Sequence, residues 1–223
     1  KIKQMNNSQN KHKIFGRRRG RKKNKDIYAQ FNSLIEKYQY KESLGESNKI
    51  LDIGSGYGEV SIYLSDTKPN HKIIACDKYF DGHLNLLKQI NTNKINNIFI
   101  YNGSVYDFLQ NLKLNKLFES IWIMFPDPWP KKKHLKRRLI NKNFLLFISN
   151  YLKKDGRIYI ASDVQNYILQ ILSSIFDCKH IFHWENQYNQ YYDYKDYFIP
   201  ETKYFKKAIK SGRKPYFIIL KRI

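Results

Sequence analysis

The stretch KILDIGSGYGEVSIYLSD, residues 49–66, leads from an apolar run through three glycines into a helical pattern. The apolar run predicts a strand over residues 49–54, and the letters after the glycines predict a helix. Gly54, Gly56 and Gly58 allow the chain to turn tightly and let its backbone approach a ligand closely. The stretch therefore predicts the first unit of an α/β fold, with a ligand site at the loop.

Short apolar runs alternate with helical patterns along the rest of the chain. Strands are expected over residues 71–77, 97–103, 119–125, 156–162 and 214–222, and helices over residues 26–40, 57–66, 80–91, 105–112, 142–153 and 164–176. This alternation indicates a Rossmann-like α/β fold, with a mostly parallel central sheet and helices on both faces. Ligands of such sheets bind at the carboxyl ends of the strands, near the point where the strand order reverses.

The chain has 223 residues, enough for one domain with a substantial core, which we expect over residues 26–223. Residues 1–25 hold eleven Lys and Arg and no acid, so we expect a basic, flexible arm there. The net charge of +22 favours a polyanionic partner, either nucleic acid or an anionic membrane surface. No apolar run is long enough to span a membrane, and Cys76 and Cys178 fit a reducing compartment. We expect a cytoplasmic protein, with a basic targeting presequence as the alternative for the arm.

An aspartate, Asp77, ends the second expected strand, about 20 residues after the glycine loop. A carboxylate there accepts hydrogen bonds from both hydroxyls of a ribose, which favours a nucleoside cofactor over a tight turn followed by a surface acid. The glycine spacing is G-x-G-x-G, whereas the dinucleotide fingerprint is G-x-G-x-x-G. Asp52, on the strand before the loop, suits a cationic ligand better than a pyrophosphate, because it would repel the latter.

The stretch SIWIMFPDPWPKKKHLKRRL, residues 120–139, places one acid, Asp127, between two prolines after an apolar run. The run predicts a strand buried on both faces, whose carboxyl end presents this acid to the ligand crevice. The prolines restrict the backbone on either side, and Trp129 offers a flat apolar surface. A turn, a core plug and a solvated helix face are the alternatives for the acid, the tryptophan and the cations that follow. Those cations, which are able to neutralise phosphates, are Lys131, Lys132, Lys133, Lys136, Arg137 and Arg138.

The segment FPDPWPKKKHLKRRL, residues 125–139, resembles the signature of the TrmB family of tRNA (guanine-N7)-methyltransferases. The loop LDIGSGYGE resembles motif I of class I S-adenosylmethionine-dependent methyltransferases, and the resemblance extends from about residue 15 to the C-terminus. It implies a class I methyltransferase fold, S-adenosyl-L-methionine as the cofactor, and tRNA as the substrate. The expected reaction is methylation of guanine N7 at position 46, in the variable loop of the tRNA.

The resemblance also implies roles for individual residues. It implies that Asp127 is both the active-site acid and a neighbour of the cofactor. It also implies that Asp52 lies near the methionine end of the cofactor and Ser104 near the adenine. The implied cofactor-binding residues are Asp52, Gly54, Gly56, Gly58, Asp77, Ser104 and Asp127. The implied substrate-binding residues are Lys131, Asp163, Thr202, Lys203, Tyr204 and Phe205. The family has a glutamate three residues after the threonine, where this chain has Phe205, so one expected contact with the guanine edge is missing.

Guanine N7 carries an in-plane lone pair, so methyl transfer needs positioning and stabilisation of charge rather than a base. We expect Asp127 to be the electrostatic and orienting group. It, or Asp163, could instead accept hydrogen bonds from the guanine N1–H and N2 amino group. Asp163 could also be the N-cap of the following helix. Tyr204 and Phe205 suit stacking on bases, although their basic segment could be a solvated loop.

Three other functions stay open on sequence grounds. They are methylation of another RNA or protein acceptor, RNA binding by a catalytically weak methyltransferase-like protein, and a nicotinamide-dependent dehydrogenase. The six histidines lack metal-ligand spacing, so we expect no metal site. The tyrosine-rich residues 183–199 predict an irregular or edge segment. We expect a monomer or a weak homodimer.

Overall fold

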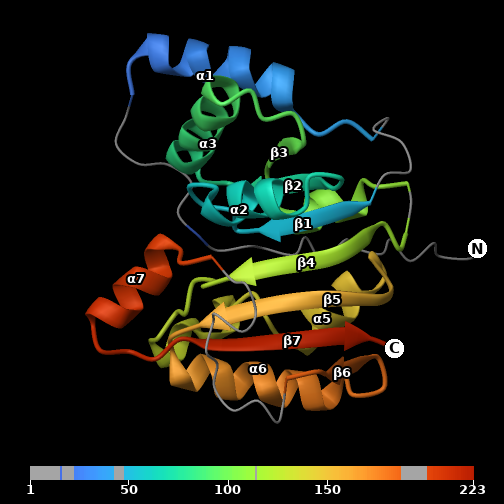
Figure 1. Ribbon diagram of the computed structural model, residues 1–223. Helices are drawn as coiled ribbons and strands as arrows, with labels where there is room; N and C mark the ends of the chain where they lie inside the picture. The colour runs from blue at the N-terminus through green and yellow to red at the C-terminus, as the bar shows by residue number, and fades with distance from the viewer. Residues whose placement is uncertain (1–15, 17–22, 43–47, 114, 187–199) are drawn as a thin grey trace, which may run out of the picture.

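The computed structural model describes residue 16 and residues 23–42, 48–113, 115–186 and 200–223. These residues form a seven-stranded sheet in the order β3-β2-β1-β4-β5-β7-β6, with helices on both faces (Figure 1). The strands are β1 Lys49–Ile53, β2 Lys72–Asp77, β3 Ile98–Asn102, β4 Phe118–Met124, β5 Leu152–Ser162, β6 Phe182–Trp184 and β7 Tyr216–Arg222. The helices are α1 Lys25–Tyr38, α2 Glu59–Thr67, α3 Phe80–Thr92, α4 Val105–Gln110, the 3₁₀ helix η1 Lys132–Arg137, α5 Lys142–Ser149, α6 Gln165–Asp177 and α7 Lys203–Lys210.

The five strands from β3 to β5 are parallel, and β7 runs antiparallel between β5 and β6. The mostly parallel α/β sheet predicted from the sequence is therefore confirmed. The strand order reverses between β1 and β4, which lie side by side at the centre of the sheet. Asp52 of β1 pairs with Trp122 of β4 across this boundary. The crevice predicted by the topology thus lies at the carboxyl ends of β1 and β4.

Two apolar layers bury the sheet. On one face, residues of α4, α5 and α6 pack against inward-facing strand residues such as Leu51 and Ile53. On the other face, α1, α2 and α3 pack against residues that include Ile50, and Phe205 of α7 joins the same cluster. Because successive residues of a strand point to opposite faces, each central strand contributes to both layers. Burial on both faces explains the continuous apolar runs in the sequence.

The structure departs from the predicted elements in the C-terminal third. The helix that begins near residue 142 ends at Ser149, and β5 begins at Leu152, because Leu152 pairs with Phe118 of β4 before the register shifts. The short edge strand β6 and the helix α7 were not predicted as such. Most of the tyrosine-rich segment, residues 187–199, lies outside the described residues. No helix within the described ranges is long and apolar enough to cross a membrane.

Candidate active site

The glycine loop, Asp77 and Asp127 all follow neighbouring strands at the carboxyl edge of the sheet. Gly54, Gly56 and Gly58 follow β1 and have φ angles of 74°, 53° and 85°, which L side chains rarely adopt. Asp77 is the last residue of β2, and Asp127 comes shortly after β4 ends at Met124. The sequence motifs are therefore brought together at the reversal point of the strand order.

Asp77 is fastened to the glycine loop by backbone groups. Its Oδ2 accepts a hydrogen bond from the Gly56 N–H at 2.8 Å. Its Oδ1 accepts hydrogen bonds from the Lys78 N–H at 2.6 Å and the Tyr79 N–H at 3.0 Å. These bonds fix the direction of the carboxylate and hold the turn after β2 against the turn after β1.

Gly82 of α3 is part of the same support, although no pattern in the sequence predicted this. A Cβ atom at Gly82 would lie 2.1 Å from the carbonyl oxygen of Gly56. A Cβ atom at Gly58 would lie 2.4 Å from Leu86, also on α3. The glycine loop therefore rests directly on α3, with no space for a side chain between the two.

Asp52 lies beneath the glycine loop and is 1% exposed. Its Oδ2 accepts a hydrogen bond from the Ser61 hydroxyl at 2.6 Å, which ties β1 to the first turn of α2. Burial raises the pKa of Asp52 to about 7, and the negative charge of Asp77 also raises it, while the bond from Ser61 acts in the opposite direction. The neutral carboxyl is therefore favoured here over a wider pH range than for an exposed aspartate.

Two further buried polar residues lie below the crevice. Ser104, at the N-cap of α4, is 3% exposed, and its hydroxyl has no hydrogen-bond partner among the described residues. His83 of α3 is fully buried, with Nε2 at 3.2 Å from the Ser55 hydroxyl and Nδ1 at 3.3 Å from Asn102 Oδ1. Burial lowers the pKa of His83. The neutral imidazole therefore links the glycine loop to the end of β3.

Asp127 is held in an unusual stretch of backbone. Phe125 and Trp129, on either side of the Pro-Asp-Pro sequence, have φ angles of 53° and 40°. Non-glycine residues adopt this conformation only when their surroundings impose it. Partial desolvation raises the pKa of Asp127, and the negative charge of Asp77 raises it further. The two carboxylates are thus close enough to repel each other.

One residue of the N-terminal region reaches this carboxylate. A Cβ atom at Gly16 would lie 3.5 Å from Oδ2 of Asp127, so the backbone of Gly16 passes against the acid. Further along, Lys23 forms an ion pair with Asp81 at 3.2 Å. The other residues of the expected arm before Lys23 lie outside the described part of the chain.

Helix α7 lies beside the glycine loop. The Lys203 N–H donates to Glu59 at 2.9 Å, and the Lys203 ammonium lies 4.7 Å from the centre of the Tyr57 ring. Thr202 caps the helix, because its hydroxyl accepts a hydrogen bond from the Phe205 N–H at 3.2 Å. Tyr204 is 52% exposed, and its pKa is raised by partial burial and by the charges of nearby Asp127 and Asp77. Tyr204 therefore lies at the mouth of the crevice.

Two expectations need correction, namely base stacking by Phe205 and helix capping by Asp163. Phe205 is 4% exposed and packs against Phe217, so its ring has no free face on which a base could stack. The spacing along α7 directs Phe205 to the core while Tyr204 points outward. Asp163 does not cap α6, whose N-cap is Val164 with no side-chain bond. Instead Asp163 accepts a 2.7 Å hydrogen bond from Arg213 Nε, in an ion pair.

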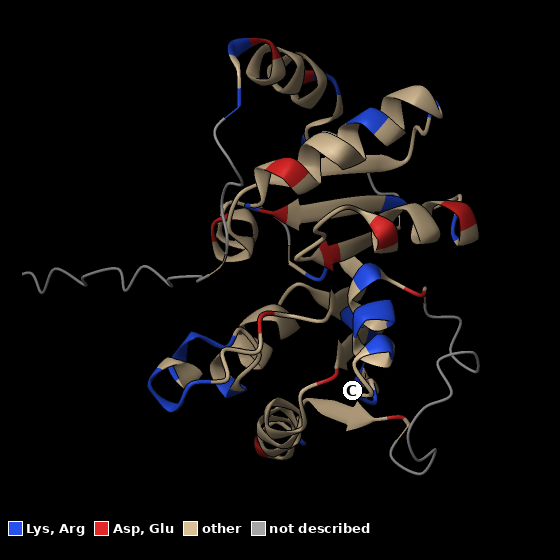
Figure 2. Cartoon of the chain, turned by 90° about the vertical axis from the view of Figure 1, so that its left-hand side faces the viewer, with Lys and Arg blue, Asp and Glu red and all other residues tan. Residues whose placement is uncertain are grey.

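Cations gather on the edge of the molecule where the parallel strands end. Figure 2 shows Lys and Arg on α7 and on the loop that contains η1. The exposed members of that loop are Lys131, Lys132, Lys133 and Lys136. Arg138 differs from them because it is buried.

The family model described as "Putative methyltransferase" matches residues 46–218, which include all of the elements from β1 to α7 and the start of β7. A tRNA (guanine-N(7)-)-methyltransferase of Wolbachia pipientis wMel is 33% identical over 194 residues, covering 83% of this chain and 84% of the relative. The chain belongs to the TrmB family of methyltransferases. It is a methyltransferase.

Other comparisons agree with this membership. A bifunctional methyltransferase of Rickettsia felis is 36% identical over 192 residues, but the match covers 85% of this chain and only 36% of that longer protein. An rRNA methylase from Streptococcus thermophilus has the same fold, with a TM-score of 0.53 and 12% identity over 90% of this chain and 98% of that one. The fold of the TrmB-family chain is therefore similar to that of a distant methylase.

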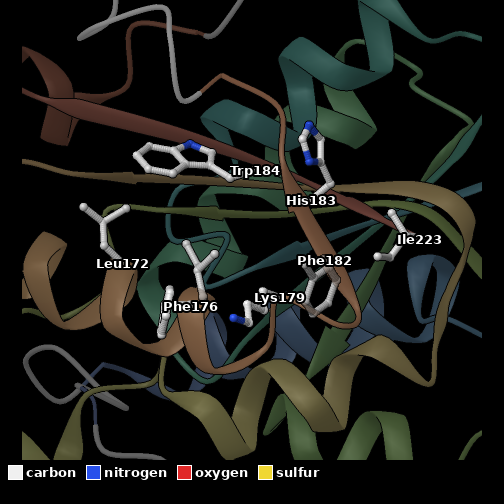
Figure 3. Close-up of a pocket in the computed structure, with 8 residues that line it drawn as sticks. Leu172, Phe176, Lys179, Phe182, His183, Trp184 and Ile223 are labelled. Carbon is white, nitrogen blue, oxygen red and sulfur yellow. The ribbon is translucent and has the colours of Figure 1, made fainter.

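A second hollow, of about 520 Å³, lies away from the carboxyl edge of the parallel strands. Figure 3 shows it between α6, the edge strand β6 and Ile223. The described residues that line it are Leu172, Ile175, Phe176, Lys179, Phe182, His183, Trp184 and Ile223. These residues include no carboxylate and no part of the glycine loop, so this hollow is not the candidate active site. Among the described residues, no cluster of His, Cys, Asp or Glu is suited to hold a metal ion.

Proposed function

We propose that this chain transfers a methyl group from S-adenosylmethionine to N7 of guanine in tRNA, at position 46 of the variable loop. The observation that carries the proposal is the Asp127 carboxylate, which follows β4 at the same edge of the sheet where the glycine loop follows β1, and whose pKa is raised by partial desolvation and by the charge of Asp77. The name of the Wolbachia relative supports the same acceptor. We further propose that the enzyme acts in the cytoplasm as a monomer or weak homodimer.

The polar groups at the carboxyl edge of the sheet suit the donor. Asp77 would accept a hydrogen bond from a ribose hydroxyl at Oδ2, which keeps one lone pair beyond its contact with Gly56, whereas Oδ1 already accepts from Lys78 and Tyr79. The unpartnered hydroxyl of Ser104 is available to a polar atom of the adenine. Gly54, Gly56 and Gly58 place backbone rather than side chains against the ligand. Asp52 would act from beneath, by holding the loop and the start of α2 in place.

The charge of the site favours a cation. S-adenosylmethionine supplies an activated methyl group on a positively charged sulfonium. The negative charge of Asp77 raises the pKa of Asp127, and a positive group near Asp127 would relieve that repulsion. As the methyl group moves to N7, the purine becomes positive, and the Asp127 carboxylate would stabilise that charge. N7 has no proton to lose, so Asp127 need not act as a base.

The tRNA would be held from two sides. Lys131 and its neighbours would bind phosphates on one side of Asp127, while Lys203 would bind them on the other. Tyr204 is the exposed ring available for stacking near the crevice. Thr202 sets the position of this segment as its helix cap, and Asp163 offers its remaining lone pairs to the guanine edge. The basic arm, residues 1–25, is proposed to add further phosphate contacts.

The acceptor atom is tested by one substitution in the RNA. Unmodified tRNA transcripts are compared with transcripts in which 7-deazaguanosine, which lacks N7, replaces guanosine. We expect 7-methylguanosine by nucleoside mass spectrometry from the first and no methyl transfer to the second, with similar binding of both. A transcript with only guanine 46 changed to adenine tests the position. Methylation of the 7-deaza transcript, or of a different nucleoside, would show that the proposed acceptor is wrong.

A further inference from the structure

Arg138 is a buried cation at the end of an exposed cationic run. It is 3% exposed, whereas the lysines before it in the η1 loop face solvent. A buried charge is tolerated only when its hydrogen-bonding groups are satisfied. Arg138 is therefore not available to a phosphate, although its place in the sequence run suggests otherwise.

The guanidinium of Arg138 joins the Pro-Asp-Pro-Trp loop to α6. Its Nε donates to the carbonyl oxygen of Pro128 at 2.8 Å. Its Nη1 donates to the Asn166 carbonyl at 3.2 Å and to Gln170 Oε1 at 2.9 Å, and its Nη2 donates to Asn166 Oδ1 at 2.7 Å. The same group lies 4.7 Å from the centre of the Tyr167 ring. These acceptors are all neutral, so this is a planar hydrogen-bonded brace rather than an ion pair.

The brace acts on the residue next to Asp127. Phe125 and Trp129, which flank the Pro-Asp-Pro sequence, have left-handed φ angles. This conformation is unfavourable for non-glycine residues, so the surrounding contacts must hold it. On the strand side, the Phe125 N–H donates to the Ala161 carbonyl at 2.8 Å. On the other side, Arg138 holds the Pro128 carbonyl. The backbone around Asp127 is therefore held on both sides by hydrogen bonds, one from the Phe125 N–H to Ala161 and one from Arg138 to the Pro128 carbonyl.

The same hydrogen bond closes a loop. Pro128 and Arg138 are ten residues apart, and the segment between them contains η1 and the exposed lysines. Because Arg138 fastens the base of this loop to α6, it fixes the position of the cations relative to the carboxylate. The buried Arg138 side chain therefore fixes the positions of both the Asp127 segment and the η1 loop.

We propose that Arg138 is a positioning residue, which holds Asp127 and the cationic η1 loop in register for methyl transfer without touching the substrate. The inference rests on the proposed function, because its kinetic consequence is measured on tRNA. A planar guanidinium is needed, since a lysine ammonium cannot reach the Pro128, Asn166 and Gln170 acceptors together.

The test compares Arg138→Met and Arg138→Lys with Lys136→Met, an exposed neighbour that loses the same charge. For both Arg138 variants we expect kcat to fall about 10²-fold, with cofactor affinity by calorimetry within about twofold and the salt dependence of tRNA binding unchanged. Lys136→Met is expected to weaken tRNA binding and lower its salt dependence instead. Hydrogen exchange of residues 128–138 should accelerate in the Arg138 variants, while exchange in β1, β4 and β5 stays as in the wild type.

Asn166→Ala provides a milder variant, because Asn166 is exposed and its loss removes one acceptor of the brace. We expect kcat to fall roughly threefold to tenfold with the KM for tRNA unchanged. Full turnover in Arg138→Lys together with weakened tRNA binding in Arg138→Met would show a phosphate contact and overturn the proposal. Unchanged turnover and exchange in Asn166→Ala would overturn it as well, even if the Arg138 variants fail to fold. Hydrogen exchange needs no tRNA, so the brace is tested even if the wild type proves inactive on tRNA and the proposed function fails.

Discussion

Replacing Phe205 by glutamate restores the residue that the family resemblance expects, yet the structure predicts that it damages the enzyme. The side chain is 4% exposed and lies against Phe217, with ring centres 6.3 Å apart. Removing a buried phenylalanine side chain costs about 3–5 kcal/mol of unfolding free energy. A carboxylate in its place adds a further penalty unless it protonates or swings out. Since proteins have only about 5–15 kcal/mol of stability, α7 is expected to detach from the sheet.

Urea-induced unfolding followed by circular dichroism measures this effect, with Phe205→Leu as the matched control. The leucine variant conserves apolar character and should lose less than about 1.5 kcal/mol, whereas Phe205→Glu should lose at least about 3 kcal/mol. Because α7 carries Lys203 and Tyr204, the glutamate variant should also bind tRNA more weakly. A glutamate variant as stable as the leucine one, and more active than the wild type, would refute the assignment of Phe205 to the core.

Three further predictions concern the loop, the buried acid and the cations. Gly82→Ala places a Cβ atom 2.1 Å from the Gly56 carbonyl oxygen, so affinity for S-adenosylmethionine should fall more than about tenfold by calorimetry; unchanged affinity would contradict the close contact. The pKa of Asp52 is raised to about 7 in the folded state, so its protonated form stabilises the fold fully below about pH 4 and this contribution is lost as pH rises towards 7. Asp52→Asn should therefore gain stability of the order of a few kcal/mol over the wild type at pH 8 and little at pH 4, and equal denaturation curves at pH 8 would argue against the raised pKa. Affinity for tRNA should fall by about 10³-fold or more between roughly 50 and 200 mM salt, less steeply after alanine replacement of residues 131–133; a flat response would contradict phosphate binding.

The parts of the site that could be predicted from the sequence are those that depend on short sequence motifs. A glycine loop between a strand and a helix lies at the end of that strand, and so does an acid that follows an apolar run. The positions of Gly54–Gly58 and Asp127 in the fold could therefore be predicted from spacing alone. The position of Asp77 followed from the same reasoning, because parallel strands end at one edge of the sheet. The alternation of apolar runs with helical patterns was enough to predict the parallel sheet.

The features that could not be predicted from the sequence depend on contacts between residues that are far apart in the chain. Arg138 and Lys136 belong to one cationic run, and only the packing of α6 makes the first a buried brace and leaves the second in water. From the sequence, Gly82 is only a residue of low helix propensity, and its contact with the Gly56 backbone is visible only in the structure. For Phe205 a signal was present, since a threonine cap precedes apolar residues at helical spacing, and that pattern predicts α7 with Phe205 inward.

The carboxylate of Asp127 is tested most directly by the single-turnover rate of methyl transfer in Asp127→Asn, measured with tRNA and S-adenosylmethionine both saturating. The amide keeps the shape of the side chain but removes the negative charge that opposes the developing charge on the purine. We expect a rate lower by about 10²-fold or more, with cofactor affinity reduced far less and 7-methylguanosine as the residual product. A rate equal to that of the wild type would contradict the role given to this carboxylate.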